Sequence, residues 1–324
     1  KIKFICETIQ FISINNLNIK NQNIMDTDKI LKSLTKRNYS EFIILSESCK
    51  GIVIKALNEE NNLVLLKTFY KIKKNGTFMK KTNSNFYIPK ELFFLEELSQ
   101  YEYVPKLIEY IDENNWSTVA MEYIGGDWMD LSYYLVEFEG EKLVKTIMRN
   151  LISIVYKMSD IGYYHRDIKP ENIMVNQKTL EIKLIDLEDM LYDENEIPIC
   201  ISELGTLGFQ SPETYGKVPY NLKQSLVFNI GCLAYFCIEY EYAFDTKIET
   251  QKCLLPEMKV SSKLARSFIT ECIKLDPDER IEFDDLLFHD WLENENNVDK
   301  NNINSYNPMA IAESLGEMFN KIIL

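Results

Sequence analysis

Apolar residues in the first part of the chain are grouped in short, strand-like runs. Four runs rich in β-branched and aromatic residues predict strands: residues 42–45, 52–57, 63–70 and 116–123. Between the third and fourth runs, residues 91–98 place Leu92, Leu95 and Leu98 three positions apart, as on one face of a helix. The first part of the chain is therefore predicted to be a sheet with one main helix.

The periodicity becomes helical in the second part of the chain. From residue 143 onward, apolar residues recur every three or four positions up to Met158, which is typical of a long amphipathic helix. Shorter β-type runs follow at residues 173–175 and 182–185. A strand-rich part followed by a helix-rich part predicts an α+β fold of two lobes, with a hinge near residues 121–127.

The two ends of the chain differ from this core. Residues 15–24 are rich in Asn, and residues 293–307 are dominated by Asn, Glu and Asp, as expected of solvated linkers. Residues 308–324 carry an apolar stripe at helical spacing. We expect this last segment to be a helix packed back on the large lobe, with docking on a partner as the alternative.

Composition and charge restrict the class of protein. The chain has 324 residues, 46% of them hydrophobic, and a formal net charge of −14. Such an acidic surface disfavours nucleic acid and anionic membranes and favours cationic partners. No apolar run is long enough for a transmembrane helix, and the first residues do not form a signal-peptide pattern.

The cysteines and histidines indicate a compartment and exclude one kind of metal site. Seven cysteines without a Cys-x-x-Cys pair argue for a reducing compartment and against a zinc site. We therefore predict the cytoplasm, with the nucleus as the alternative. Two histidines are too few for a histidine-rich metal centre.

The most informative segment is residues 164–174, which read Tyr-His-Arg-Asp-Ile-Lys-Pro-Glu-Asn-Ile-Met. Phosphoryl transfer needs a carboxylate for the attacking hydroxyl, a cation for the phosphoryl group and an oxygen ligand for Mg²⁺. Asp167, Lys169 and Asn172 can supply these in that order. The segment resembles the catalytic loop of the eukaryotic protein kinase family.

A second match follows this loop. The resemblance implies that Asp186, at the end of a strand, is the second metal ligand, in the place of the Asp of the family's Asp-Phe-Gly motif. Leu187 and Glu188 stand in place of Phe and Gly. Gly at that position permits unusual backbone angles, so Glu188 puts the metal affinity and the mobility of the segment in question.

The first part of the chain resembles the small lobe of the same family. Lys67 matches the strand Lys that pairs with the ATP phosphates. Glu91 matches its helix partner, with Glu96 and Glu97 as competing choices that fit the downstream residues less well. The glycine-rich loop is eroded, because only Gly51 and Val53 of its pattern remain in residues 46–53. The nucleotide-binding residues that the resemblance implies are Leu45, Gly51, Val53, Lys67, Glu91, Met121, Glu122, Tyr123 and Met174.

The segment after Asp186 resembles a kinase activation segment. Residues 205–213 are similar to its Gly-Thr to Ala-Pro-Glu end, and the resemblance implies that Glu213 pairs with Arg280. Thr206 together with Lys169 is typical of serine/threonine kinases. Leu226 departs from the family, which has there an Asp that tethers the catalytic loop. The PIM-type branch tolerates that loss, and the chain is weakly similar to PIM and calmodulin-dependent kinases.

Arg166, next to Asp167, needs an anionic partner in the family. Phosphorylation of Ser202 is one candidate. The carboxylates of Asp193, Glu194 or Glu196 are the alternative that we favour from the sequence, because the segment is already rich in acidic residues.

The sequence thus predicts a bilobal protein-kinase fold that transfers the γ-phosphoryl group of ATP, with Mg²⁺ or Mn²⁺, to serine or threonine of proteins. The expected segments are an extension (1–41), the small lobe (42–121), the large lobe (122–292), the linker (293–307) and the terminal helix (308–324). Glu171 and Asp127 match positions that bind Arg side chains, so basic substrates are expected. A catalytically silent kinase-like scaffold is the main alternative, and a small-molecule phosphotransferase is a weaker one.

Overall fold

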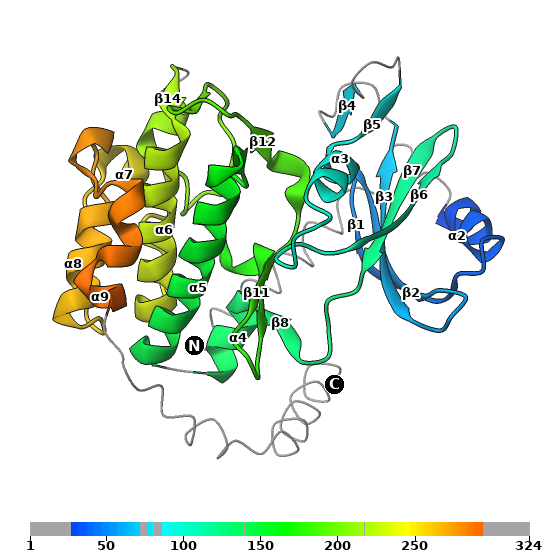
Figure 1. Ribbon diagram of the computed structural model, residues 1–324, viewed down its shortest axis with the longest axis horizontal. Helices are drawn as coiled ribbons and strands as arrows, with labels where there is room; N and C mark the ends of the chain where they lie inside the picture. Colours follow the sequence, from blue (N-terminus) through cyan, green and yellow to red (C-terminus); the bar gives the residue numbers. More distant parts are fainter. Residues whose placement is uncertain (1–26, 72–76, 81–85, 139, 217, 294–324) are drawn as a thin grey trace. The chain divides into compact units, whose positions relative to one another are not determined.

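A computed structural model describes residues 27–71, 77–80, 86–138, 140–216 and 218–293 (Figure 1). The chain divides into two compact units. We call them the sheet unit, Lys1–Ser99 with Lys106–Tyr123, and the helical unit, Gln100–Pro105 with Ile124–Leu324. The sheet-rich first part and helix-rich second part confirm the predicted α+β fold class.

The division differs from the predicted segments at two points. Residues 100–105 belong to the helical unit, and the change of unit follows Tyr123 rather than residue 121. The first difference has a local cause, because the Tyr103 carbonyl accepts a hydrogen bond of 2.8 Å from the Leu184 amide. This bond attaches residues 100–105 to a strand of the helical unit.

The sheet unit is built on a five-stranded antiparallel sheet of order β1-β2-β3-β7-β6. Its strands are β1 (Ser40–Glu47), β2 (Gly51–Leu57), β3 (Leu63–Tyr70), β6 (Leu107–Asp112) and β7 (Trp116–Glu122). A short hairpin of β4 (Phe78–Lys80) and β5 (Tyr87–Pro89) leads into helix α3 (Lys90–Glu97). Side chains of β2 alternate between buried and half-buried, as expected where the two faces of a sheet differ.

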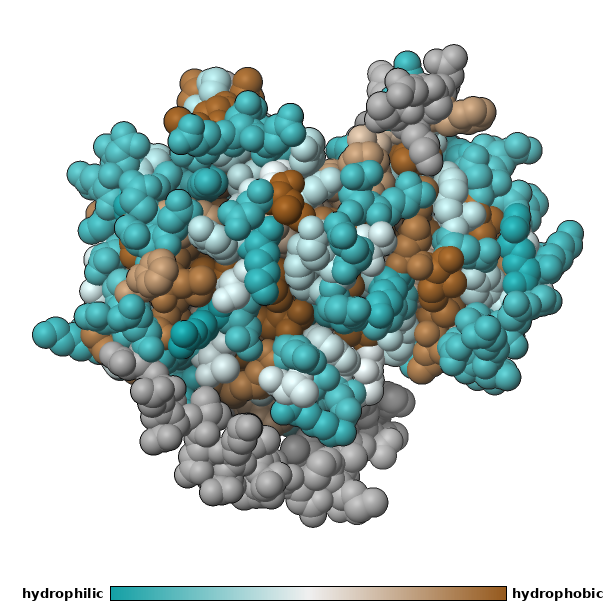
Figure 2. Space-filling model, in the orientation of Figure 1, coloured by the Kyte–Doolittle hydropathy of each residue, from teal (hydrophilic) through white to brown (hydrophobic). Residues whose placement is uncertain are grey.

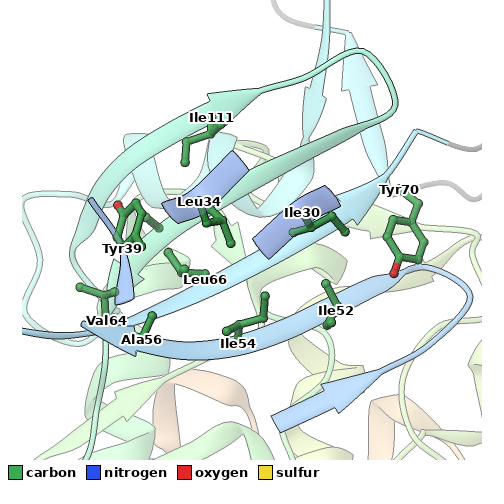
Figure 3. Packing of buried hydrophobic residues seen from close by; sticks show 11 residues of the cluster. Ile30, Leu34, Tyr39, Ile52, Ile54, Ala56, Val64, Leu66, Tyr70 and Ile111 are labelled. Carbon is green, nitrogen blue, oxygen red and sulfur yellow. The ribbon is translucent and has the colours of Figure 1, made fainter. Parts of the chain in front are cut away.

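A helix that the sequence did not predict covers one face of this sheet. Helix α2 (Thr27–Thr35) buries Ile30 and Leu34, which are 0% and 1% exposed. Figure 3 shows these two side chains directed at the apolar side chains of one sheet face. The sheet residues of this cluster that come from β2 and β3 are Ile52, Ile54, Ala56, Val64, Leu66 and Tyr70. The remaining face of β2 and β3 is therefore left for other residues, among them Val53 and Lys67.

The helical unit is organised around helices α5 and α6. Helix α5 (Glu141–Asp160) is amphipathic, as its spacing predicted, whereas α6 (Leu222–Glu239) is buried on nearly every side, as in the core of a large unit. The Asn221 side chain caps α6 by accepting hydrogen bonds from two backbone amides. The other helices are α4 (Leu131–Glu137), α7 (Lys247–Lys252), α8 (Lys263–Cys272) and α9 (Asp290–Glu293).

Short strands and turns of the helical unit carry the loops of interest. Strands β8 (Trp128–Asp130), β10 (Ile173–Asn176) and β11 (Ile182–Leu184) form a three-stranded sheet. Two further pairs join β9 (Tyr163–Tyr164) to β12 (Leu191–Tyr192) and β13 (Ile199–Cys200) to β14 (Tyr220–Asn221). The 3₁₀ helices are η1 (Pro170–Asn172), η2 (Leu187–Asp189), η3 (Pro212–Gly216), η4 (Pro277–Glu279) and η5 (Phe283–Phe288).

Hydrophilic side chains cover much of the face shown in Figure 2. None of the helices in the described ranges has the length and apolar character needed to cross a membrane. The predicted Asn-rich segment 15–24, the linker beyond residue 293 and the terminal helix 308–324 lie outside the described residues.

Candidate active site

The Asp167 carboxylate is the centre of a hydrogen-bonded group in the helical unit. Its Oδ1 accepts a 2.7 Å bond from the Thr206 hydroxyl, and its Oδ2 lies 2.7 Å from the Lys169 ammonium. The Asn172 side-chain amide donates to the same Oδ2, at 3.0 Å. A carboxylate has about four lone-pair positions, so three bonds leave one acceptor position on Asp167. That position suits a hydroxyl group that gives up its proton.

Lys169 and Thr206 also bind each other. The Lys169 ammonium donates to the Thr206 hydroxyl at 2.8 Å, while that hydroxyl donates to Asp167. The predicted pair of catalytic residues, Asp167 and Lys169, is thus brought together. Thr206 was noted in the sequence only as typical of the enzyme class, and its direct bond to Asp167 was not predicted.

His165 fixes the backbone around Asp167. Its ring is buried; Nε2 lies 3.0 Å from the Ile185 carbonyl, and Nδ1 lies 3.4 Å from the Asp167 amide. The carbonyl can only accept and the amide can only donate, so Nε2 carries the proton and Nδ1 does not. Burial lowers the pKa of His165 below its usual value, which keeps the ring neutral. The ring therefore joins Asp167 to the residue before Asp186.

Two residues of this region have left-handed backbone angles. Arg166 and Asp186 have φ values of 68° and 63°, which non-glycine residues adopt only when the surrounding structure holds them there. Glu188, by contrast, lies in the 3₁₀ helix η2 and has no positive φ. The Glu that replaces the family's Gly therefore causes no backbone strain here.

Asn172 and Asp186 offer the oxygen atoms that a divalent metal requires. The Asn172 Nδ2 group donates to the backbone carbonyl and to the carboxylate of Asp167, so its amide oxygen is the atom left for a ligand. Two such oxygen ligands suit Mg²⁺, which also keeps water and phosphate oxygens. Over the ranges that the structure describes, no three His, Cys, Asp or Glu side chains form a metal-binding group. A metal held by Asn172 and Asp186 would complete its coordination with oxygen atoms of water or of a ligand.

Negative charge accumulates beside these two residues. Burial, reinforced by the charges of Glu188 and Asp167, raises the pKa of Asp189 above its usual value. Asp186 contributes to the same effect. A bound cation would relieve this repulsion.

The predicted Lys67–Glu91 pair is present in the sheet unit. The Lys67 ammonium, on β3, lies 2.6 Å from Glu91 Oε2, on α3, and the Glu91 side chain is 3% exposed. Val53 pairs with Lys67 across the sheet, and Val119 pairs with Lys67 on the other side. Paired residues share a face, so Val53 and Lys67 lie on the sheet face that α2 does not cover.

The segment expected to cover phosphates is a tight β-hairpin. The Ser48 amide donates to the Gly51 carbonyl at 2.9 Å, and the Ser48 hydroxyl accepts from the Lys50 amide at 3.2 Å. A Cβ atom on Gly51 would lie 1.9 Å from the Thr68 carbonyl oxygen on the neighbouring strand. Gly51 is therefore required by the packing of β2 against β3, and its presence is no evidence for phosphate binding.

The other predicted nucleotide-binding residues are spread over both units. Met121 on β7 is buried and pairs with Leu65 on β3. Leu45 is exposed at an irregular position of β1. The Glu122 side chain accepts a bond from the Lys106 amide, and the Tyr123 ring lies under the Lys55 ammonium. Met174 lies on β10 of the helical unit. Each unit thus carries its own part of the predicted site.

Arg166 is bound to the activation segment by Ser202. Its Nη2 donates to the Ser202 hydroxyl at 2.7 Å, and its buried Nε has no hydrogen-bond partner among the described residues. Asp193 instead accepts bonds from Asn195 and Ile199, and Glu194 accepts one from Tyr192. The geometry thus favours the Ser202 alternative over Asp193 and Glu194, two of the three carboxylates that the sequence suggested.

The predicted Glu213–Arg280 pair is bidentate, with Arg280 buried and Glu213 half-buried. The Arg280 Nη1 and Nη2 atoms lie 2.7 and 2.8 Å from the two Glu213 carboxylate oxygens. The same guanidinium donates to the Gln224 and Lys274 carbonyls. This pair fixes the end of the activation segment to the core of the helical unit.

Comparisons with known proteins agree with this geometry. Residues 49–292 match the family model described as protein kinase domain. Serine/threonine-protein kinase 1 of African swine fever virus (strain Badajoz 1971 Vero-adapted) is 29% identical over 203 residues, 62% of this chain and 67% of that protein. Calcium/calmodulin-dependent protein kinase type 1 of Caenorhabditis elegans is 26% identical over 58% of this chain and 57% of its own length. Serine/threonine-protein kinase pim-2 of Danio rerio is 28% identical over 47% and 48%.

Proposed function

Since this chain belongs to the protein kinase family and is an ATP-dependent serine/threonine protein kinase, we propose that it uses Mg²⁺ and phosphorylates basic segments of proteins. The observation that supports the proposal is the arrangement around the Asp167 carboxylate. Three donors bind this carboxylate and leave it one free acceptor position. In that position it can orient a serine or threonine hydroxyl and accept its proton.

The roles of the surrounding residues follow from their charges. Lys169 places a cation beside Asp167, where it can stabilise negative charge on the phosphoryl group being transferred. Asn172 and Asp186 would hold the metal, which when bound neutralises phosphate charge. Lys67, aligned by Glu91, would bind the phosphates from the sheet unit.

The proposed substrate preference rests on charge. The chain carries a formal net charge of −14, and Glu171 is exposed on the helical unit. Asp127 is also exposed and is paired with Lys178 at 2.8 Å. An exposed pair of this kind contributes only about 0–1 kcal/mol, so an Arg of a substrate can replace Lys178 at little cost.

The decisive experiment is transfer from radiolabelled ATP to a lysine- and arginine-rich protein, with Mg²⁺ and with Mn²⁺. Asp167→Asn keeps the shape of the side chain but removes the base, so we expect transfer to fall by at least about 100-fold. Asp160→Asn, an exposed carboxylate on α5 of the same unit, is the matched control and should keep full activity. ATP-induced thermal stabilisation without any transfer would contradict the proposal and favour a nucleotide-binding scaffold.

A peptide array tests the substrate preference separately. We expect peptides with Arg before the phosphorylated residue to be the best substrates. The double variant Asp127→Asn, Glu171→Gln should raise KM for these peptides and leave KM for the other peptides unchanged. Selection of acidic or proline-directed peptides would contradict a basic preference.

We further propose that phosphorylation of Ser202 activates the enzyme, since a phosphate there would meet the Arg166 guanidinium. Phosphatase treatment and Ser202→Ala should then both lower kcat. Full activity after either treatment would contradict this regulation.

For location, we propose the cytoplasm, with the nucleus as the alternative, because the seven cysteines show no disulfide or zinc spacing. Imaging of the tagged full chain would test this.

A further inference from the structure

The helical unit lacks the carboxylate that tethers the catalytic loop in related kinases. Leu226, at that position, is 8% exposed and its side chain can neither donate nor accept a hydrogen bond. A small pocket of about 40 Å³ is lined by Leu226 and Asn229 together with His165 and Arg166 of the loop. The loop must therefore be held to α6 in another way.

Asn229, one helical turn after Leu226, holds the loop with hydrogen bonds of the opposite direction: its amide donates to backbone carbonyls, whereas a carboxylate could only accept. Its Nδ2 donates to the Ile168 carbonyl at 2.9 Å and to the Phe209 carbonyl at 3.1 Å. Both amide hydrogens are thus used, one on the catalytic loop and one on the activation segment. The two acceptor residues are themselves buried, so these carbonyls would lose more than a water-exposed group if the bonds were broken.

The two bonds act on the two sides of the Asp167–Thr206 contact. Ile168 directly follows Asp167, and the Phe209 and Gln210 amides both donate to the Thr206 carbonyl. The Asn229 side chain therefore fixes both the backbone next to Asp167 and the turn that carries Thr206. Its own position is rigid, because Val227, Phe228 and Ile230 are 0% exposed.

We propose that Asn229 is a positioning residue for phosphoryl transfer, holding Asp167 and Thr206 in register in place of the missing carboxylate. It touches neither substrate nor nucleotide in this role. Its loss should therefore lower the rate of the chemical step more than the affinity for either substrate.

The test uses Asn229→Leu in the full chain, which keeps the size of the side chain and removes both donors. Asn229→Ser, a smaller change that cannot reach both carbonyls, serves if the first variant folds poorly. The matched control is Asn150→Leu, because Asn150 on α5 donates one 2.8 Å bond to the Leu180 carbonyl away from the catalytic loop. Steady-state kinetics for ATP and a basic peptide are measured below the unfolding temperatures of all variants.

We expect kcat of the Asn229 variants to fall by about 10- to 100-fold, with KM for ATP and peptide changed by less than about threefold. The Asn150 variant should lower the unfolding temperature and leave kcat unchanged. An active parent whose kcat survives Asn229→Leu, or falls equally in Asn150→Leu, would overturn the inference. An inactive parent would contradict the proposed function as well.

Discussion

At the scale of single residues, His165 links the acid–base behaviour of the chain to its stability. The ring is neutral in the folded state and accepts the Asp167 amide hydrogen at Nδ1, so a proton added there would break that bond. Burial lowers the pKa of His165, whereas the unfolded chain binds the proton at about pH 6.5. The stabilisation is complete above that pH and is lost as the pH falls below it.

We therefore predict a pH-dependent difference between the parent chain and His165→Gln. Between pH 7.5 and 5.5, the free energy of unfolding of the parent should fall by up to about 1.4 kcal/mol more than that of the variant. Urea unfolding at three pH values measures this. Identical slopes for the parent and His165→Gln would refute the prediction.

Arg280 gives a second prediction at this scale, because its side chain is 0% exposed beside Glu213. Arg280→Leu leaves the Glu213 carboxylate without its donors, and we expect a loss of about 3–5 kcal/mol in unfolding free energy. Lys247→Leu removes the exposed pair with Glu203 and should cost less than about 1 kcal/mol. Denaturant titration measures the loss of unfolding free energy in both variants. Equal losses would contradict the larger contribution of the buried Arg280.

At the scale of elements, helix α2 and the sheet stabilise each other through one apolar interface. Leu34 is 1% exposed against this face, so Leu34→Ala should lower the stability of the sheet unit by about 2–5 kcal/mol. Lys32→Ala, on the exposed side of the same helix, should change it by less than about 0.5 kcal/mol. Urea unfolding followed by circular dichroism gives both values, and a small effect of Leu34→Ala would mean that α2 is only loosely attached.

The elements also show what the sequence could predict. Strands β1 to β3 and β7 follow from short runs of β-branched and aromatic residues, and helices α3 and α5 follow from apolar residues at helical spacing. Helix α2 was not predicted, since its nine residues offer only two buried positions, after an Asn-rich stretch. Its burial depends on a sheet formed by residues that follow it in the chain.

The site was predictable where one short loop supplies the chemistry. Asp167, Lys169 and Asn172 lie within six consecutive positions, so their mutual contacts follow from local geometry. Asn229 lies some sixty positions later and is recognisable only once α6 is seen to pass under the loop. The absence of an acidic residue at position 226 was the one signal in the sequence that a substitute tether was needed.

At the scale of the whole molecule, the net charge of −14 should act on substrate binding over distance. Salt screens such attraction beyond about 8–10 Å at physiological ionic strength. Raising the ionic strength from about 0.05 to 0.5 M should therefore increase KM for a basic peptide several-fold and leave kcat nearly unchanged. Initial rates at several salt concentrations measure this, with an uncharged peptide as the control; equal salt effects on both peptides would argue against electrostatic attraction.

Helix α2 lies before the region that matches the family, which begins at residue 49. A recombinant fragment cut at that border would keep Ile52, Ile54 and Leu66 but lose the side chains that shield them from water. A bare apolar sheet of this kind tends to aggregate. A recombinant fragment of this enzyme should therefore begin upstream of Thr27. A fragment that begins at residue 49, where the family match begins, should be insoluble.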